Sequence, residues 1–278
     1  MTQTPLPTPS PVPSPTPSSL PLGAGFRFST YGPPSNPGPD YWASVGTQMS
    51  AKFPASTPAT IWIVGNFDGN GVYLNFPCET QDPRIRCGYF DMNEESLVLF
   101  DQLGIAVWLQ VEPGDGSVDE LIDITLKQYG HHPSVVGFGI DVEWYHSTGA
   151  PEGQPVTDEE TARWVKAVRA HNPKYWLFLK HWKTEWLPPT VRDGIFFVDD
   201  SQQFDSFEHM LEEFTAWGEH FAPSPVGFQY GYPADSPWWK KLSDPPGDIG
   251  RALLAGVPNT RGLFWVDFTA LEVFPPQP

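Results

Sequence analysis

Several residue types are scarce in this chain, and each scarcity excludes a class of protein. Two cysteines among 278 residues are too few for a cysteine-dense scaffold or a four-cysteine zinc site. Basic residues are also few, since 16 Lys and Arg stand against 33 Asp and Glu and give a formal net charge of −17. Such a charge repels nucleic-acid backbones and anionic membrane surfaces. No apolar run reaches the ~20 residues that a membrane span needs. We therefore expect no nucleic-acid partner and no membrane insertion.

Charge is absent altogether from the first 26 residues. Eight of the first 23 residues are proline, mixed with threonine and serine, and such a composition is typical of an extended spacer that buries no core. We predict a disordered Pro/Thr/Ser-rich spacer over residues 1–23 and one folded domain over residues 24–278. Spacers of this kind are common in secreted or cell-surface-tethered proteins. We therefore expect that localisation, with any signal peptide already removed.

The two cysteines, Cys78 and Cys87, lie in the loop-like stretch CETQDPRIRC. They either close a small disulfide ring, which fits export, or remain as two unpaired loop thiols. We predict the disulfide.

The rest of the chain alternates between β-rich runs and amphipathic runs, which is typical of βα units. Residues 24–278 are close in number to the ~250 of a (β/α)8 barrel. Capping-box patterns at Ser117 and Thr157 mark two helix starts. We predict an α/β chain folded as one monomeric (β/α)8 TIM barrel. No helical pattern follows the eighth strand, so the last helix is either absent or not included in the chain. The eight candidate strands begin near Gly25, Thr60, Ile105, Val135, Tyr175, Gly194, Val226 and Gly262.

Catalytic groups of such barrels lie at the carboxyl ends of the strands. The predicted ends are rich in carboxylates, amides and aromatic rings. Rings stack on hexose faces and polar groups hydrogen-bond to hydroxyls, so this composition indicates a sugar site. The candidate residues are Trp108, Glu112, Asp141, Glu143, Trp144, His181, Asp199, Gln229, Tyr230, Trp265 and Asp267.

Asp141 and Glu143 are the most specific pair among them. Alternate residues of a strand face the same way, so both should point into the barrel about 7 Å apart. Two carboxylates this close raise each other's pKa, and a glutamic acid whose pKa approaches neutrality serves as a general acid. The structural alternatives are a buried, salt-bridged pair, or a surface loop if the fourth strand ends early. The spacing therefore predicts Glu143 as proton donor and Asp141 as its partner.

The run VVGFGIDVEWY resembles the fourth-strand signature of family-18 chitinases and endo-β-N-acetylglucosaminidases, which ends in D-x-D-x-E. Asp141 and Glu143 match the final D-x-E, whereas the two earlier acids of the family fall on Val136 and Gly139. The resemblance implies that Glu143 protonates the glycosidic oxygen. It also implies that Asp141 orients the 2-acetamido group of the substrate, which itself acts as nucleophile.

Two further positions are similar to that family. Tyr230, in GFQYGY, matches a strand-end tyrosine, and Trp265, in GLFWVDF, matches the tryptophan of the eighth strand. The resemblance implies that Tyr230, with Gln229, holds the reacting sugar and that Trp265 stacks beneath it. The likeness covers about a dozen residues of the barrel.

The overall prediction is a secreted glycoside hydrolase that cleaves a polysaccharide or oligosaccharide. We expect acid-assisted, retaining hydrolysis, which is substrate-assisted if the resemblance holds, and we expect no cofactor and no bound metal.

Three alternatives stay open. A two-carboxylate β-glucanase-like or cellulase-like hydrolase would pair Glu143 with Glu112, Asp199 or Asp267. A lectin-like barrel would bind sugar without turnover. A polysaccharide deacetylase would hold a metal at His181 and Asp199.

One histidine pair lies apart from these strand ends. His131 and His132 precede a proline at the start of the predicted fourth strand, which is the non-catalytic end of a barrel. We expect a structural role for both.

Overall fold

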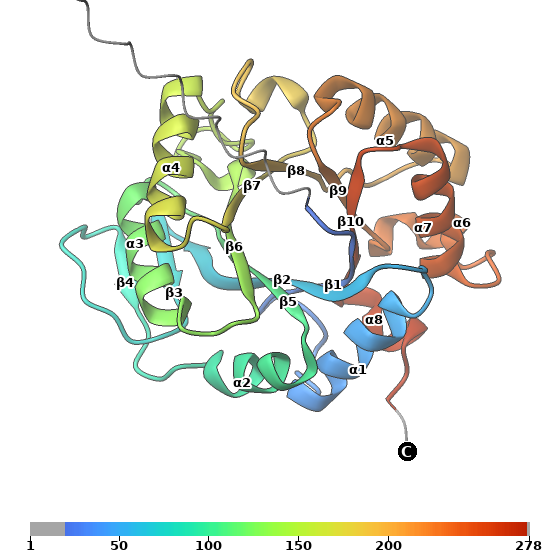
Figure 1. The fold of residues 1–278 in the computed structure, drawn as a ribbon, viewed down its shortest axis with the longest axis horizontal. Helices are drawn as coiled ribbons and strands as arrows, with labels where there is room; N and C mark the ends of the chain where they lie inside the picture. Colours follow the sequence, from blue (N-terminus) through green and yellow to red (C-terminus); the bar gives the residue numbers. More distant parts are fainter. Residues whose placement is uncertain (1–19, 277–278) are drawn as a thin grey trace, which may run out of the picture.

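The computed structural model describes residues 20–276, so residues 1–19 of the predicted spacer lie outside the described residues. Figure 1 shows the strands at the centre and the helices around them. The strands are β1 (Gly23–Phe28), β2 (Thr57–Asp68), β3 (Gly71–Leu74), β4 (Ile85–Cys87), β5 (Ala106–Val111), β6 (Val135–Asp141), β7 (Trp176–Lys180), β8 (Ile195–Asp199), β9 (Val226–Tyr230) and β10 (Thr260–Val266). The helices are α1 (Pro39–Ser50), α2 (Glu94–Leu103), α3 (Val118–Tyr129), α4 (Asp158–His171), α5 (Phe207–Phe221), α6 (Ser236–Trp239), α7 (Pro245–Gly256) and α8 (Ala270–Val273).

Eight of the strands form a closed parallel barrel. They pair in the order β1, β2, β5, β6, β7, β8, β9 and β10, and β10 pairs again with β1. The predicted (β/α)8 barrel is therefore confirmed. Within residues 20–276, the helices are all too short or too polar to cross a membrane.

The structure also tests the predictions about the last helix and about the residues that cap two helices. A short helix, α8, does follow β10, so the expectation that nothing helical comes after the eighth strand is wrong. Thr157 and Glu160 form the predicted capping box at the start of α4. Ser117 caps α3 by accepting a hydrogen bond from the backbone N–H of Glu120.

The barrel interior is filled by side chains that alternate with those packed against the helices. Large rings such as Trp108 and Phe178 lie inside, and glycines opposite them make room. A Cβ on Gly139 would lie 1.9 Å from the ring of Phe178, and one on Gly137 would lie 2.6 Å from the ring of Trp108. The position at which the resembled family carries an upstream acid is thus occupied here by the neighbouring ring. The interior cluster comprises Leu20, Ala59, Ile61, Trp108, Phe178, Phe196, Val198 and Phe264.

Two short strands that the sequence analysis missed extend the barrel wall beside β2. β3 pairs with β2 in antiparallel fashion, and β4 pairs with β3 in parallel. Gly69, with a φ of 68°, supplies the left-handed conformation of the turn between β2 and β3. Cys87 at the end of β4 forms the predicted disulfide with Cys78, with Cα atoms 5.4 Å apart.

The folded part of the chain begins before the boundary that composition suggests. Leu20 is buried and belongs to the interior cluster of the barrel. The backbone carbonyl of Leu22 accepts a hydrogen bond of 2.9 Å from the N–H of Thr57. Barrel contacts therefore reach back to residue 20.

We expect two truncations of the amino terminus to differ in stability. Deleting residues 1–19 should leave the melting temperature unchanged, whereas deleting residues 1–22 should lower it. Burial of a leucine stabilises by about 1.5–3 kcal/mol. In a domain of this size, each kcal/mol shifts the melting temperature by roughly 2–4 °C. Differential scanning calorimetry of the two proteins measures the difference, and equal melting temperatures would show that Leu20 contributes nothing.

Candidate active site

Polar side chains meet inside the barrel at the carboxyl ends of its strands. The alternation that places Trp108 and Phe178 in the interior also turns the residues two positions further along toward the barrel axis. Six buried polar residues result, one from or just after each of six strands: Arg27, Gln110, Asp141, Lys180, Asp200 and Gln229. This is the end of the barrel where catalytic groups are found in this fold.

Three carboxylates lie together at this end. Asp141, Glu143 and Asp200 each offer an oxygen, and these oxygens all lie within 4.8 Å of one another. β6 ends at Asp141, and the chain then turns through a 3-10 helix, Val142–Trp144, that carries Glu143. The pair is therefore closer than the spacing along a continuous strand predicts. Asp141 and Asp200 are buried, while Glu143 is half-buried.

Lys180 is the cation of this cluster. Its Nζ lies 2.7 Å from Oδ2 of Asp141 and 2.5 Å from Oδ2 of Asp200. Gln110 Nε2 donates a further hydrogen bond of 3.3 Å to the same oxygen of Asp141. Oδ1 of Asp141 and Oδ1 of Asp200 are buried and have no hydrogen-bond partner among the described residues. One ammonium therefore serves two carboxylates whose second oxygens remain available.

This crowding changes the acidity of the cluster. Burial, followed by the negative charge of Asp200, raises the pKa of Glu143 to about 7, against the opposing effect of Lys180. Burial likewise raises the pKa of Asp141 well above its usual value, although Lys180 acts against it. Burial lowers the pKa of Lys180, but Asp141 and Asp200 outweigh it and the net pKa is raised. Near neutral pH, Lys180 is therefore charged, and Glu143 can act both as a proton donor and as a proton acceptor.

A pocket of about 440 Å³ opens beside the cluster. Glu143 and Asp200 both line it, so the acid with the near-neutral pKa and the carboxylate paired with lysine face one space. An indole ring and amide side chains on its wall match the groups that bind sugars. Its other lining residues include Trp182, Gln202, Gln203 and Phe204.

Glu112 and Trp144 lie on the neighbouring rim. Oε2 of Glu112 accepts hydrogen bonds from the hydroxyl of Tyr31, at 2.5 Å, and from the N–H of Phe67, at 2.8 Å. Burial raises the pKa of Glu112. The ring of Trp144 stacks on that of Phe67 with centroids 4.5 Å apart. These contacts hold Glu112 and Trp144 in place on the rim next to the carboxylate cluster.

Gln229 also faces the barrel interior. Its Oε1 accepts a hydrogen bond of 3.2 Å from the hydroxyl of Tyr232, and its Nε2 is buried with no partner among the described residues. Gln229 thus points into the barrel near the carboxyl end of β9.

Tyr230 and Trp265, in contrast, do not face the site. Because Gln229 points inward, its neighbour Tyr230 points toward the helices, where its hydroxyl donates to the carbonyl of Pro246. Trp265 is fully buried on the same outer layer and donates through Nε1 to Thr269. The two rings pack edge to face with each other. The structure gives both a packing role, and this differs from the sugar contacts that the resemblance implies.

Two acids predicted as partners of Glu143 also lie outside the cluster. Asp199 faces away from the barrel axis and accepts a hydrogen bond of 2.8 Å from the N–H of Ser201. Asp267 forms a buried ion pair with Arg27 at 2.6 Å and accepts the N–H of Ser29. Both are held by contacts that do not reach Glu143.

His181 and Trp108 are likewise engaged elsewhere. Nδ1 of His181 accepts the N–H of Lys183 at 2.8 Å, so Nε2 carries the proton and donates to the carbonyl of Glu152. This arrangement does not bring His181 and Asp199 together as ligands of one metal site. Trp108 lies deeper in the barrel, against Phe178.

Sequence analysis did not select Lys180 and Asp200 as site residues. The signal was present, because Lys180 follows the interior residue Phe178 by two positions and Asp200 follows Val198 by two. Counting two positions from the interior residue Val198, rather than from the end of the strand, would have selected Asp200 instead of Asp199.

The carboxylate cluster has the geometry of a cation site, and its cation is Lys180. The ammonium lies within 2.7 Å of two of the three acids, where a divalent ion would otherwise be held. A metal would have to compete with a buried charge of the same sign. The arrangement therefore suits proton transfer and nucleophilic attack by carboxylates.

Comparison with known proteins shows likeness at the level of the fold. The sequence matches no protein-family model and no curated protein. A solved structure from Bacteroides thetaiotaomicron, provisionally named an alpha-L-fucosidase, is similar with a TM-score of 0.57 and 14% identity, over 94% of this chain and 91% of that chain. It shares the barrel fold with this chain.

Two further solved structures are β-glucuronidases, from an uncultured Clostridium species and from Dictyoglomus thermophilum. Their TM-scores are 0.41 and 0.44 and their identities 11% and 12%, over 64% and 74% of this chain. The chain spans 35% and 37% of their lengths.

Proposed function

We propose that this chain is a glycoside hydrolase that retains the anomeric configuration, with Glu143 as general acid and base and Asp200 as nucleophile. One observation carries the proposal. A carboxyl group whose pKa is about 7 lies within 4.8 Å of a carboxylate paired with lysine, and both line one pocket. Carboxyl groups of retaining glycosidases are about 5–5.5 Å apart, whereas those of inverting enzymes are about 6.5–9.5 Å apart.

The reaction follows from these positions. Protonated Glu143 donates its proton to the glycosidic oxygen, and an oxygen of Asp200 attacks the anomeric carbon as the C–O bond breaks. The aglycone leaves as an alcohol and a glycosyl ester of Asp200 forms. Ionised Glu143 then takes a proton from water, whose oxygen displaces Asp200 from the anomeric carbon. Lys180, 2.5 Å from Oδ2 of Asp200, holds the nucleophile in place between turnovers.

The contacts of Asp141 favour this two-carboxylate mechanism over the substrate-assisted one. In the latter, Asp141 would orient an acetamido group of the substrate. Here Oδ2 of Asp141 faces Lys180 and Gln110, and the described residues that line the pocket include Glu143 and Asp200 but not Asp141. Asp141 thus serves to position Lys180. Of the partners weighed from the sequence, Glu112 has one oxygen engaged by the hydroxyl of Tyr31 and the N–H of Phe67.

The location of the protein and the class of its substrate stay predictions. Disulfides persist mainly in oxidising compartments, so the Cys78–Cys87 bond supports the proposal that the enzyme is secreted or tethered at the cell surface. We also propose an oligosaccharide or polysaccharide substrate, since the pocket is lined by an indole ring and amides.

The test is the stereochemistry of the first product. A panel of aryl glycosides of both anomeric configurations is incubated with the enzyme and followed by proton NMR before mutarotation. We expect the hydrolysed member to release its sugar first in the configuration of the substrate. Release in the opposite configuration would contradict the role of Asp200 as nucleophile. Binding of sugars with no hydrolysis of any member would favour the lectin-like alternative.

A further inference from the structure

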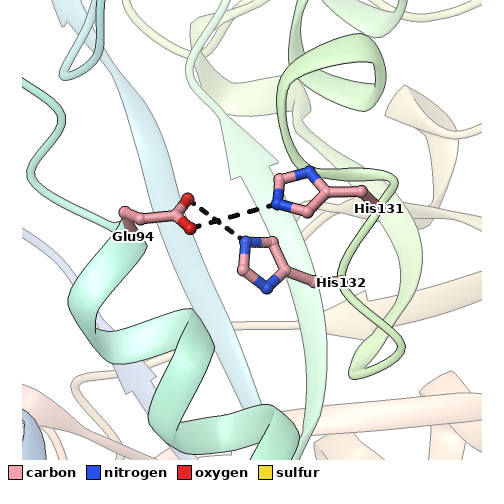
Figure 2. A group of neighbouring side chains, drawn as sticks. All are labelled: Glu94, His131 and His132. Carbon is pink, nitrogen blue, oxygen red and sulfur yellow. Dashed lines mark hydrogen bonds and ion pairs between the residues drawn. The ribbon is translucent and has the colours of Figure 1, made fainter.

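A second cluster of chemically active side chains lies apart from the carboxylate site. It consists of Glu94, His131 and His132 and is shown in Figure 2. Glu94 is the first residue of α2, and the two histidines lie in the connection from α3 to β6. They precede β6 at its amino end, whereas Asp141 closes the same strand at its carboxyl end. The cluster is therefore separate from the proposed active site.

The other nitrogen of each imidazole already has a partner. Nδ1 of His131 lies 3.0 Å from the backbone carbonyl of Gln128, and Nδ1 of His132 lies 2.7 Å from Oδ2 of Asp101. Both partners accept hydrogen bonds, so they favour the tautomer with the proton on Nδ1, in which Nε2 is the atom that can bind a metal. Both Nε2 atoms face Glu94, at 4.0 Å from Oε1 for His131 and 3.3 Å from Oε2 for His132.

We propose that Glu94, His131 and His132 bind a divalent transition metal ion, with Zn²⁺ as the best-suited ion. The donor set of two imidazole nitrogens and one carboxylate oxygen is one that zinc accepts, with water as fourth ligand. Ligands about 2.1 Å from a tetrahedral zinc lie roughly 3.4 Å from one another. The three donor atoms already lie within 4.8 Å of one another. Small movements of the half-buried Glu94 and the exposed His131 side chains close that gap.

The surroundings hold the ligands in this arrangement. The start of α2 is tied to the last residue of α3, because Asn93 donates to the hydroxyl of Tyr129 and that hydroxyl donates to Asp91, each at 2.8 Å. Asp101 also accepts the backbone N–H of Ser134 at 2.9 Å, which fixes the carboxylate behind His132. A carboxylate or carbonyl behind each ligating histidine is the usual outer shell of a zinc site.

The expected role of the metal is mechanical. It would join the first turn of α2 to the connection that leads into β6, the strand that carries Asp141. Zinc bound here should raise the melting temperature by about 5–10 °C at a free concentration of roughly 100 times the dissociation constant. Hydrolysis at the carboxylate cluster should not require the zinc ion. A failure of this inference would therefore not contradict the proposed function, and the reverse also holds.

Isothermal titration of the full chain with zinc chloride tests the site. The protein carries no polyhistidine tag and is freed of metal with EDTA beforehand. We expect one zinc ion per chain. Glu94→Gln and His131→Ala alter ligands that are not fully buried and should each weaken binding at least about tenfold, and Asp101→Asn about 10–100-fold. His220→Ala, which removes another exposed histidine, and Glu143→Gln, which alters the acidic cluster, should leave zinc binding unchanged.

Each outcome decides the proposal. Stoichiometric binding that is lost in the first two variants and kept in the two controls supports it. Absence of binding up to about 100 µM zinc, or binding that both ligand variants retain, overturns it. Loss of zinc binding in Glu143→Gln alone would place the metal at the carboxylate cluster and would equally overturn it.

Discussion

Replacing Glu143 with glutamine should lower kcat/KM by about 10²–10⁴-fold on glycosides whose leaving group needs a proton. The substitution keeps the shape of a half-buried side chain and removes the proton that the glycosidic oxygen requires. The loss should be much smaller for an aryl glycoside with a strongly acidic phenol, because that leaving group departs unaided. In the same assay, azide should restore turnover of the glycosyl intermediate, since this nucleophile needs no general base.

The pH dependence of the native enzyme has a defined sign. Burial raises the pKa of Glu143 to about 7, and the proposed mechanism needs its protonated form in the free enzyme. The value of kcat/KM should therefore fall as pH rises through about 7, and Glu143→Gln should lack this limb. Folding stability responds in the same direction. Because the folded pKa lies above the ordinary value of a glutamic acid, the native protein loses stability as pH rises toward 7, and Glu143→Gln should remove that loss.

The control is Glu185→Gln. Glu185 is an exposed carboxylate in the connection after β7, on the same rim of the barrel. It should keep the activity and the pH profile of the native enzyme. Hydrolysis of a poor leaving group by Glu143→Gln at near-native rates would remove Glu143 from the acid role.

The barrel could be predicted from the sequence because alternation of strand and helix repeats through the chain and needs no long-range knowledge. The two added strands could not. β3 has four residues and β4 three, and strands this short carry almost no period-two pattern. Leu20 sits among prolines that predict a spacer, and only the packed structure shows that its side chain enters the barrel.

The site was predicted in part, and two of the errors share one physical cause. A shift of one residue along a strand moves a side chain to the opposite face. Asp199 was chosen where Asp200 faces inward, and Tyr230 was chosen although its neighbour Gln229 faces inward. Asp141 and Glu143 came together because the strand ended in a 3-10 turn, which sequence periodicity does not reveal.

Lys180 was overlooked for a different reason. A lysine at a strand end is ordinarily a solvated residue, and its burial becomes visible only when two acids from other strands are placed against it. Asp141 ends β6 and Asp200 follows β8, and both form ion pairs with Lys180 on β7, the strand between them. No local pattern encodes such a contact.

Replacing Lys180 with methionine should destabilise the protein by about 3–5 kcal/mol near neutral pH, the usual cost of leaving buried charges unpaired. The variant keeps the length of the side chain but leaves the carboxylates of Asp141 and Asp200 without their cation. Urea denaturation at several pH values measures the effect. Without Lys180, which acts against the rise, the folded pKa of Asp141 should lie further above its unfolded value. The deficit should therefore be largest at neutral and alkaline pH and shrink as pH falls and Asp141 takes up a proton.

Activity should fall with stability in Lys180→Met, by roughly 10³-fold or more, because Asp200 loses the ammonium that holds its carboxylate in place for attack. The matched control is Lys183→Met. Lys183 lies three residues further along and pairs with Glu152 at 2.6 Å, but its side chain is 32% exposed. A surface pair of this kind is worth at most about 1 kcal/mol, so this variant should keep both fold and rate. Equal stability of the two variants at pH 7 would show that Lys180 does not hold the buried acids together.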